Sequence, residues 1–131
     1  MAGSVLDSDV LIDHLRGVGP GRDLVRSLVQ SQGYRVTAVT AFELALGRSY
    51  HRDPRPVHAL LSVPLLTLGR RAGLRGGELL AELRRGGAAI DFRDAMQAGI
   101  CLEAGAMLVT RNLGHFERVP GLRVAHPVEL L

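Results

Sequence analysis

Short apolar segments alternate with helix-forming segments along this chain, and this alternation constrains the fold more than any other feature. Strands are predicted over residues 4–6, 35–39, 65–68, 107–109 and 122–124. Helices are predicted over residues 7–15, 23–30, 40–46, 57–61, 69–87 and 91–105. Such an order favours a parallel sheet with helices on both faces. At 131 residues, the chain has the size of one α/β domain, spanning 1–131.

Local signals mark some helix ends and leave others open. Gly17 is predicted to end the first helix, and Thr40 with Glu43 forms a capping-box pattern that predicts a helix start after the second strand. Residues 52–56 are predicted to form a turn or loop, since two prolines lie within them. Three glycines interrupt the segment 69–87, so its boundaries stay undetermined.

The basic and sulfur-containing residues exclude several classes of protein. All 16 basic side chains are Arg, so the chain has no Walker A lysine and no Schiff-base lysine. The lone Cys101 cannot form an internal disulfide or a cysteine-type zinc site, and we expect it to pack in the core. The formal net charge of +3, carried by guanidinium groups, favours an anionic partner.

The N-terminal segment has no basic stretch followed by an apolar run, because Asp7, Asp9 and Asp13 interrupt it. We therefore expect no signal peptide. No run of 18 apolar residues occurs, so we expect no membrane association and a cytoplasmic location.

Polar residues follow three of the predicted strands where each strand ends. They are Asp7 after the first, Thr40 and Glu43 after the second, and Thr110, Arg111 and Asn112 after the fourth. Ligands of open parallel sheets bind at this edge. Asp94 shares a helix face with Ala98 and Cys101, which draws its carboxylate toward the core. Converging carboxylates repel one another unless a divalent ion neutralises them, so this set favours a Mg²⁺ or Mn²⁺ site for phosphodiester hydrolysis.

Each acidic residue also has a structural interpretation. The capping box with Thr40 accounts for Glu43, and Asp91 and Asp94 are suited to the N-cap and first turn of their own helix. Asp7 and Asp9 suit a helix cap in the same way. We expect Asp13 to be a solvated helix residue and His115 to lie on the surface.

Four segments together resemble the successive motifs of PIN-domain nucleases: residues 5–13 (VLDSDVLID), 40–44 (TAFEL), 94–98 (DAMQA) and 108–116 (LVTRNLGHF). Residues 119–122 (VPGL) are similar to the usual ending of VapC-type toxins. The resemblance implies a PIN-like domain with Mg²⁺- or Mn²⁺-dependent endoribonuclease activity, a VapB-type antitoxin partner and a homodimer. By motif position it makes Asp7, Glu43 and Asp94 the catalytic, metal-binding residues.

A mechanism follows from this resemblance. The metal held by the three carboxylates activates a water for attack on an RNA phosphate, and Thr110 or Ser8 orients that water. Arg111, Arg93 and Arg48 are candidates for positioning the RNA backbone.

The sequence departs from the family pattern at two positions. Asn112 stands where many relatives carry a fourth Asp, and His115 stands where an Asp often precedes the following Phe. Asn112 can offer a metal one neutral oxygen but no charge. We therefore predict a site with fewer fixed negative charges, with Asn112 as a candidate ligand and Asp91 or Asp9 as candidate helpers.

Two alternatives stay open at the level of sequence. The segment from Val5 to Val10 also fits the opening motif of haloacid-dehalogenase-type phosphatases, with Asp7 as nucleophile, although the lysine of that class is missing. The second alternative is a PIN-like module that binds RNA or protein without cleavage, which the departures at Asn112 and His115 favour.

Overall fold

The computed structural model describes residues 3–31 and 33–131, and its strands form a parallel sheet. Strand β1 (Val5–Leu6) pairs with β4 (Leu108–Val109), which pairs with β5 (Val124–Ala125), while β2 (Val36–Thr37) pairs with β3 (Leu65–Leu66). A parallel bridge between Val5 and Arg35 joins the two groups. The resulting spatial order is β3, β2, β1, β4, β5.

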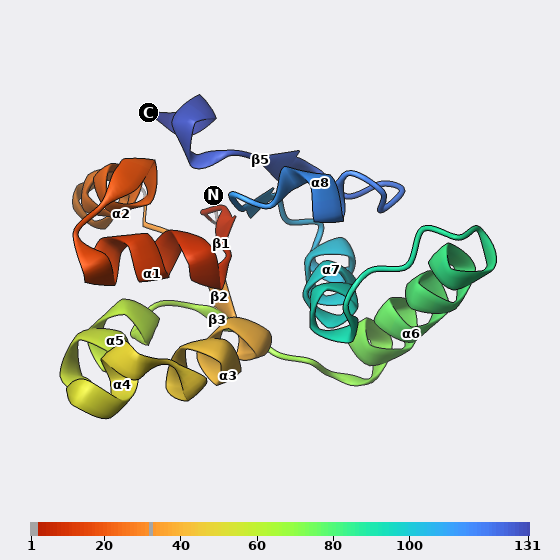
Figure 1. Cartoon of the computed structure of the whole chain (residues 1–131), viewed down its shortest axis with the longest axis horizontal. Coiled ribbons are helices and arrows are strands. Elements are labelled where there is room, and N and C mark those ends of the chain that lie inside the picture. The colour runs from red at the N-terminus through yellow and green to blue at the C-terminus, as the bar shows by residue number, and fades with distance from the viewer. Residues whose placement is uncertain (1–2, 32) are drawn as a thin grey trace.

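Helices make up most of the rest of the described chain (Figure 1). In chain order they are α1 (Ser8–Arg16), α2 (Gly19–Gln30), α3 (Ala38–Leu46), α4 (Arg48–Arg52), α5 (Arg55–Leu61), α6 (Arg70–Arg85), α7 (Phe92–Ala104), α8 (Leu113–Phe116) and the 3-10 helix η1 (Pro127–Leu130).

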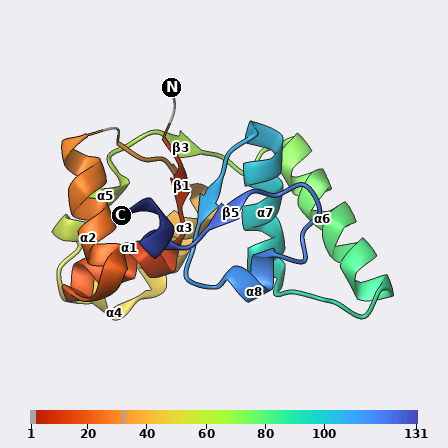
Figure 2. The same ribbon diagram turned by 90° about the horizontal axis from the view of Figure 1, so that it is seen from above.

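Successive strand residues point to opposite faces of the sheet, and each face is covered by helices. Leu6 and Val109 lie in one buried cluster with residues of α1, α2 and α5, whereas Val5 and Leu108 lie in another with residues of α6 and α7. Figure 2 shows the strands between these two groups of helices. The predicted parallel α/β sheet with helices on both faces is thus confirmed.

Strand β1 lies between β2 and β4, so the chain connects outward to one side of β1 first and to the other side later. The carboxyl end of β1 therefore lies at the switch point of the sheet, where open α/β folds bind their ligands. Asp7 is the residue directly after β1.

The third helix begins earlier than its capping pattern predicts. Helix α3 starts at Ala38, and its N-cap is Thr37, whose hydroxyl accepts a hydrogen bond from the Thr40 backbone N–H at 3.1 Å. The predicted capping box of Thr40 with Glu43 is therefore wrong. Glu43 lies in the second turn of the helix, so capping does not account for its position.

Two other segments also differ from the prediction. The loop predicted over 52–56 is shorter than expected, because α4 ends at Arg52 and α5 begins at Arg55, and α6 runs without interruption through its glycines. Gly76 permits this helix to approach α7, because a Cβ there would lie 2.8 Å from the Ala95 carbonyl oxygen. In the described ranges, no helix has the length and apolar character of a membrane span.

Candidate active site

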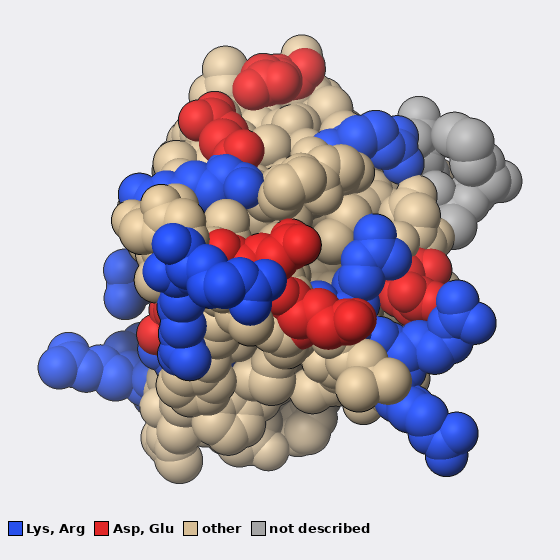
Figure 3. Space-filling view, turned by 90° about the vertical axis from the view of Figure 1, so that its right-hand side faces the viewer, with Lys and Arg blue, Asp and Glu red and all other residues tan. Residues whose placement is uncertain are grey.

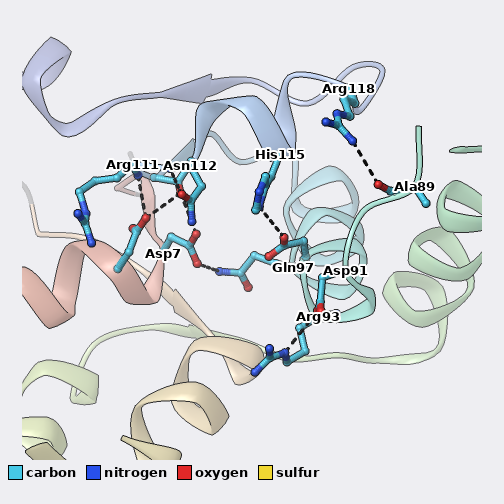
Figure 4. A network of polar contacts seen from close by, with 12 residues as sticks. Asp7, Ala89, Asp91, Arg93, Gln97, Arg111, Asn112, His115 and Arg118 are labelled. Carbon is cyan, nitrogen blue, oxygen red and sulfur yellow. Dashed lines mark hydrogen bonds and ion pairs between the residues drawn. The ribbon is translucent and has the colours of Figure 1, made fainter. Parts of the chain in front are cut away.

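Asp7 is the buried centre of a polar network at the end of β1. As the N-cap of α1, its Oδ1 accepts a hydrogen bond from the Ser8 backbone N–H at 2.9 Å. Thr110, which follows β4, donates its hydroxyl to Asp7 Oδ2 at 2.9 Å. Gln97 Nε2 from α7 donates to Asp7 Oδ1 at 3.2 Å (Figure 4). The Asp7 carboxylate is thus held in place by hydrogen bonds from α1, from α7 and from the end of β4.

Gln97 is a positioning residue that the sequence patterns did not single out. It is almost completely buried, accepts a hydrogen bond from Thr37 at Oε1 and donates to Thr40 Oγ1 at 3.0 Å as well as to Asp7. A buried amide needs such partners to offset its desolvation. Its place one turn after Asp94 on α7 is the only sequence signal that could have indicated this role.

Asp9 lies beside Asp7 and has one carboxylate oxygen without a partner. Its Oδ2 accepts hydrogen bonds from the Arg111 backbone N–H at 3.0 Å and from the Thr110 hydroxyl at 3.3 Å. Its Oδ1 is buried and, among the described residues, makes no hydrogen bond. An unpaired buried carboxylate oxygen is costly, so it is a natural position for a cation.

Glu43 and Asp94 extend the acidic cluster toward α3 and α7. Glu43 Oε1 accepts a hydrogen bond from the Ser8 hydroxyl at 3.1 Å, which links α3 to α1. Asp94 Oδ2 lies 3.2 Å from His115 Nδ1 on α8 (Figure 4). Asp91 is the N-cap of α7, accepting from the Arg93 backbone N–H at 2.8 Å, as its structural interpretation predicted.

The pKa values of the four acidic groups all lie above their ordinary values, mainly because of burial. Burial and then the negative charge of Asp9 raise the pKa of Asp7 from 3.8 to about 7, against hydrogen bonds from Thr110 and Ser8 that lower it. Burial likewise raises the pKa of Asp9, Glu43 and Asp94. Carboxylates brought together out of water favour a partner that carries positive charge.

Comparisons with known proteins agree with this geometry. The PIN domain family matches residues 4–122. The tRNA(fMet)-specific endonuclease VapC of Salmonella typhimurium is 31% identical over 94 residues, which cover 68% of this chain and 71% of that protein. The chain belongs to the PIN-domain family, in its VapC branch.

Further relatives support the same assignment. The VapC endonuclease of Shigella flexneri is 32% identical over 93 residues, covering 67% of this chain and 70% of its own. A crystal structure of DNA-bound VapBC from Salmonella typhimurium matches with a TM-score of 0.80 and 25% identity, over 97% of this chain and 99% of the other. This chain therefore belongs to a family of toxin–antitoxin endonucleases, and the family assignment overturns the phosphatase alternative.

The oxygen donors of this PIN domain suit a hard divalent cation. Carboxylates are the ligands that Mg²⁺ and Mn²⁺ prefer, and the unpartnered Asp9 Oδ1 and the raised pKa of Asp7 show that the cluster lacks compensating charge. Within residues 3–31 and 33–131, no three acidic, histidine or cysteine side chains converge closely enough to hold an ion without rearrangement. The donor set therefore fits the ion in its chemistry, since every candidate ligand is an oxygen.

The two departures from the PIN pattern have different surroundings. Asn112 is exposed, and its backbone N–H donates to Thr110 Oγ1 at 3.1 Å. Thr110 in turn donates to Asp7, so Asn112 is linked to Asp7 through Thr110. His115 is exposed, as expected, but its ring is held against Asp94 rather than turned away from the cluster.

Two arginines predicted to contact RNA already have acidic partners. Arg111 Nε lies 3.3 Å from Asp13 Oδ2, and Arg93 Nε lies 3.4 Å from Asp91 Oδ1. The expectation that Asp13 is solvated is wrong: its side chain is only 7% exposed. It is covered because Gly21 of α2 packs against it, so closely that a Cβ there would lie 2.6 Å from Asp13 Cβ. Cys101 is buried in the core as predicted, and burial raises its pKa to about 12.

Proposed function

We propose that this VapC-type protein is a Mg²⁺- or Mn²⁺-dependent endoribonuclease that a VapB-type antitoxin inhibits. One observation carries the proposal: four largely buried carboxylates, of Asp7, Asp9, Glu43 and Asp94, lie within electrostatic reach of their neighbours beside the switch point of the sheet, in a chain of an endonuclease family. Structural side chains are rarely crowded in this way, since each buried negative charge costs stability.

Asp7, Glu43 and Asp94 would hold the ion, with Asp9 supplying charge that Asn112 does not. When bound, the ion would lower the pKa of a water and neutralise charge on the phosphate. Residues of the chain then have supporting roles. The Ser8 and Thr110 hydroxyls donate to Glu43 and Asp7, so they orient these carboxylates, and their role in orienting the water stays a prediction.

RNA is the proposed substrate, and tRNA is the first RNA to test. Two relatives are tRNA(fMet)-specific endonucleases by name. Purified protein is incubated with total tRNA and with Mg²⁺, Mn²⁺ or EDTA, beside Asp7→Asn and Asp94→Asn variants. We expect discrete fragments only with wild-type protein and a divalent ion. Equal cutting in EDTA, or by both variants, would refute the proposal.

The antitoxin proposal rests on the solved structures, several of which are VapBC complexes. Co-purification with a VapB-type antitoxin should abolish the cleavage and suppress growth arrest on expression. Unchanged cleavage in a stable complex would contradict this part of the proposal.

We also propose a homodimer. The apolar faces of α1 and α2 pack into the core and are not available for it. The exposed apolar side chains that gather elsewhere include Phe42 of α3 and Phe92 of α7, which are 56% and 61% exposed and line one apolar pocket with Leu68 and Met96. Light scattering of wild type and Phe42→Ser distinguishes a dimer through this patch, which the variant dissociates, from a monomer.

The binding-module alternative depends on Asn112, because a site with one charge fewer could bind RNA without cutting it. That function predicts RNA binding that EDTA does not alter and no cleavage with any divalent ion. An Asn112→Asp variant that gains cleavage would then identify the missing charge.

A further inference from the structure

A groove beside the acidic cluster lies between α1 and the α3–α4 segment. Its lining includes Ile12 from α1 and Leu44 from α3, and Glu43 of the acidic cluster forms part of its wall. The volume is about 510 Å³, within the usual range of pockets that hold one small ligand. Figure 1 shows α1 lying across from α3 and α4. The groove is therefore continuous with the site proposed for cleavage.

Three arginines from two helices line this groove. Arg16 is in the last turn of α1, and Arg48 and Arg52 are in α4. Arg48 and Arg52 are four residues apart, so they lie on one side of their helix, where like charges destabilise it. The stability of α4 therefore does not explain their placement.

The three guanidinium groups are free to bind an anion. In the part of the chain that the structure describes, none of them forms an ion pair or a side-chain hydrogen bond. Arg93 and Arg111, by contrast, are engaged by Asp91 and Asp13. The free positive charge next to the cluster thus lies in the groove, which includes Arg48 of the predicted RNA contacts but neither Arg93 nor Arg111.

The face formed by α6 has a mixed charge instead. On the face formed by α6, basic and acidic side chains are interspersed (Figure 3). There Arg71 and Arg75 both pair with Glu103. Mixed charge of this kind neutralises itself and gives little attraction to a polyanion.

We propose that the groove lined by Arg16, Arg48 and Arg52 binds the phosphodiester backbone of single-stranded RNA on one side of the bond that is cut. This inference rests on the proposed function, since it assumes that cleavage takes place at the end of the groove where Glu43 lies. Guanidinium groups grip phosphate through paired N–H donors. A groove of this volume fits a nucleotide or two of one strand, and three cations with no acidic partners suit repeated phosphates better than a peptide.

The first test measures RNA binding in EDTA, where cleavage does not interfere. The affinity of a fluorescein-labelled single-stranded RNA is followed by anisotropy as salt rises, for wild type and for the triple variant Arg16→Gln, Arg48→Gln, Arg52→Gln. Each phosphate contact contributes about 0.7 to the slope of log K against log salt for single strands. We expect the triple variant to lose about 2 from this slope.

A matched control removes the same charge far from the groove. The triple variant Arg70→Gln, Arg84→Gln, Arg85→Gln changes three exposed arginines of α6. We expect it to keep the wild-type slope. Circular dichroism and thermal melting check that both variants fold as wild type does. Equal losses in the two variants would mean that net charge alone attracts the RNA, and would overturn the proposal.

Steady-state cleavage separates this inference from the proposed function. With Mn²⁺, the groove variant should raise KM at least tenfold while kcat changes little, and the α6 variant should change neither. Metal-dependent cleavage with an unchanged KM in the groove variant refutes the groove and leaves the function intact. Failure of the wild-type protein to cut any RNA refutes the proposed function instead. The salt dependence of RNA binding in EDTA then still shows whether the groove binds RNA. A groove variant that keeps RNA but loses a VapB-type antitoxin would assign the groove to the protein partner.

Discussion

Replacing Asp7 by Asn should stabilise the metal-free protein at alkaline pH. The Asp7 carboxylate is buried, and its pKa is raised from 3.8 to about 7 by burial and by Asp9. The folded state therefore binds this proton more tightly than the unfolded state does. At about 1.4 kcal/mol for each pKa unit, the ionised carboxylate costs on the order of 4 kcal/mol of folding free energy above pH 7.

The sign of the pH dependence follows from that raised pKa. Well below pH 3.8, Asp7 is protonated in both the folded and the unfolded protein, and the cost is absent. As pH rises from about 4 to about 7, the unfolded state loses its proton first, so stability falls across this window. An Asn side chain keeps the shape and can accept from the Ser8 and Gln97 donors, yet it never ionises.

Urea unfolding in EDTA at pH 5 and pH 8, followed by circular dichroism, measures the effect. We expect Asp7→Asn to exceed wild type by up to about 4 kcal/mol at pH 8 and by clearly less at pH 5. Mn²⁺ at pH 8 should stabilise wild type and not the variant. A variant less stable than wild type at pH 8 would show that the hydrogen bonds of Asp7 outweigh its desolvation, and would refute the reasoning.

Four further variants test packing and the metal site. Gly99→Ala should lower stability by about 1–3 kcal/mol in urea unfolding, because the new Cβ would lie 2.5 Å from the Ala72 carbonyl oxygen. The control Gly77→Ala, with open space around the new Cβ, should be neutral or slightly stabilising. Equal effects of the two substitutions would contradict the close packing of α6 on α7. Tyr34→Phe should cost about 1 kcal/mol, because it removes the buried hydrogen bond to the Leu60 carbonyl oxygen at 2.7 Å; an unchanged midpoint would mean that this bond contributes nothing net. Asn112→Asp should tighten Mn²⁺ binding in a calorimetric titration, and an unchanged affinity would place Asn112 away from the ion.

The fold and the strand-end position of the site follow from short-range patterns in the sequence. Asp7 comes directly after an apolar strand and starts an amphipathic helix that Gly17 ends with a φ of 69°. The order of strands and helices then brings the carboxyl ends of β1 and β4 together, which makes Asp7 and Thr110 neighbours. These relations need only local periodicity and the general topology of parallel sheets.

The errors arise where distant contacts decide the outcome. Both Thr37 and Thr40 are suitable caps, and the choice depends on where the two-residue strand β2 ends in the sheet. Asp13 is buried by the approach of α2 and paired with Arg111 from the other half of the chain. Gln97 has no local feature that distinguishes it from a surface glutamine, because its partners come from three other elements.

Direct binding of Mn²⁺ tests the central claim, that the carboxylates at the end of β1 form a divalent cation site. Electron paramagnetic resonance reports free Mn²⁺ during a titration at pH 8 of wild type and of Glu43→Gln, a variant of almost the same shape. The account predicts saturable binding to wild type and binding at least tenfold weaker in the variant. Identical titrations, or no binding to either protein, would contradict it.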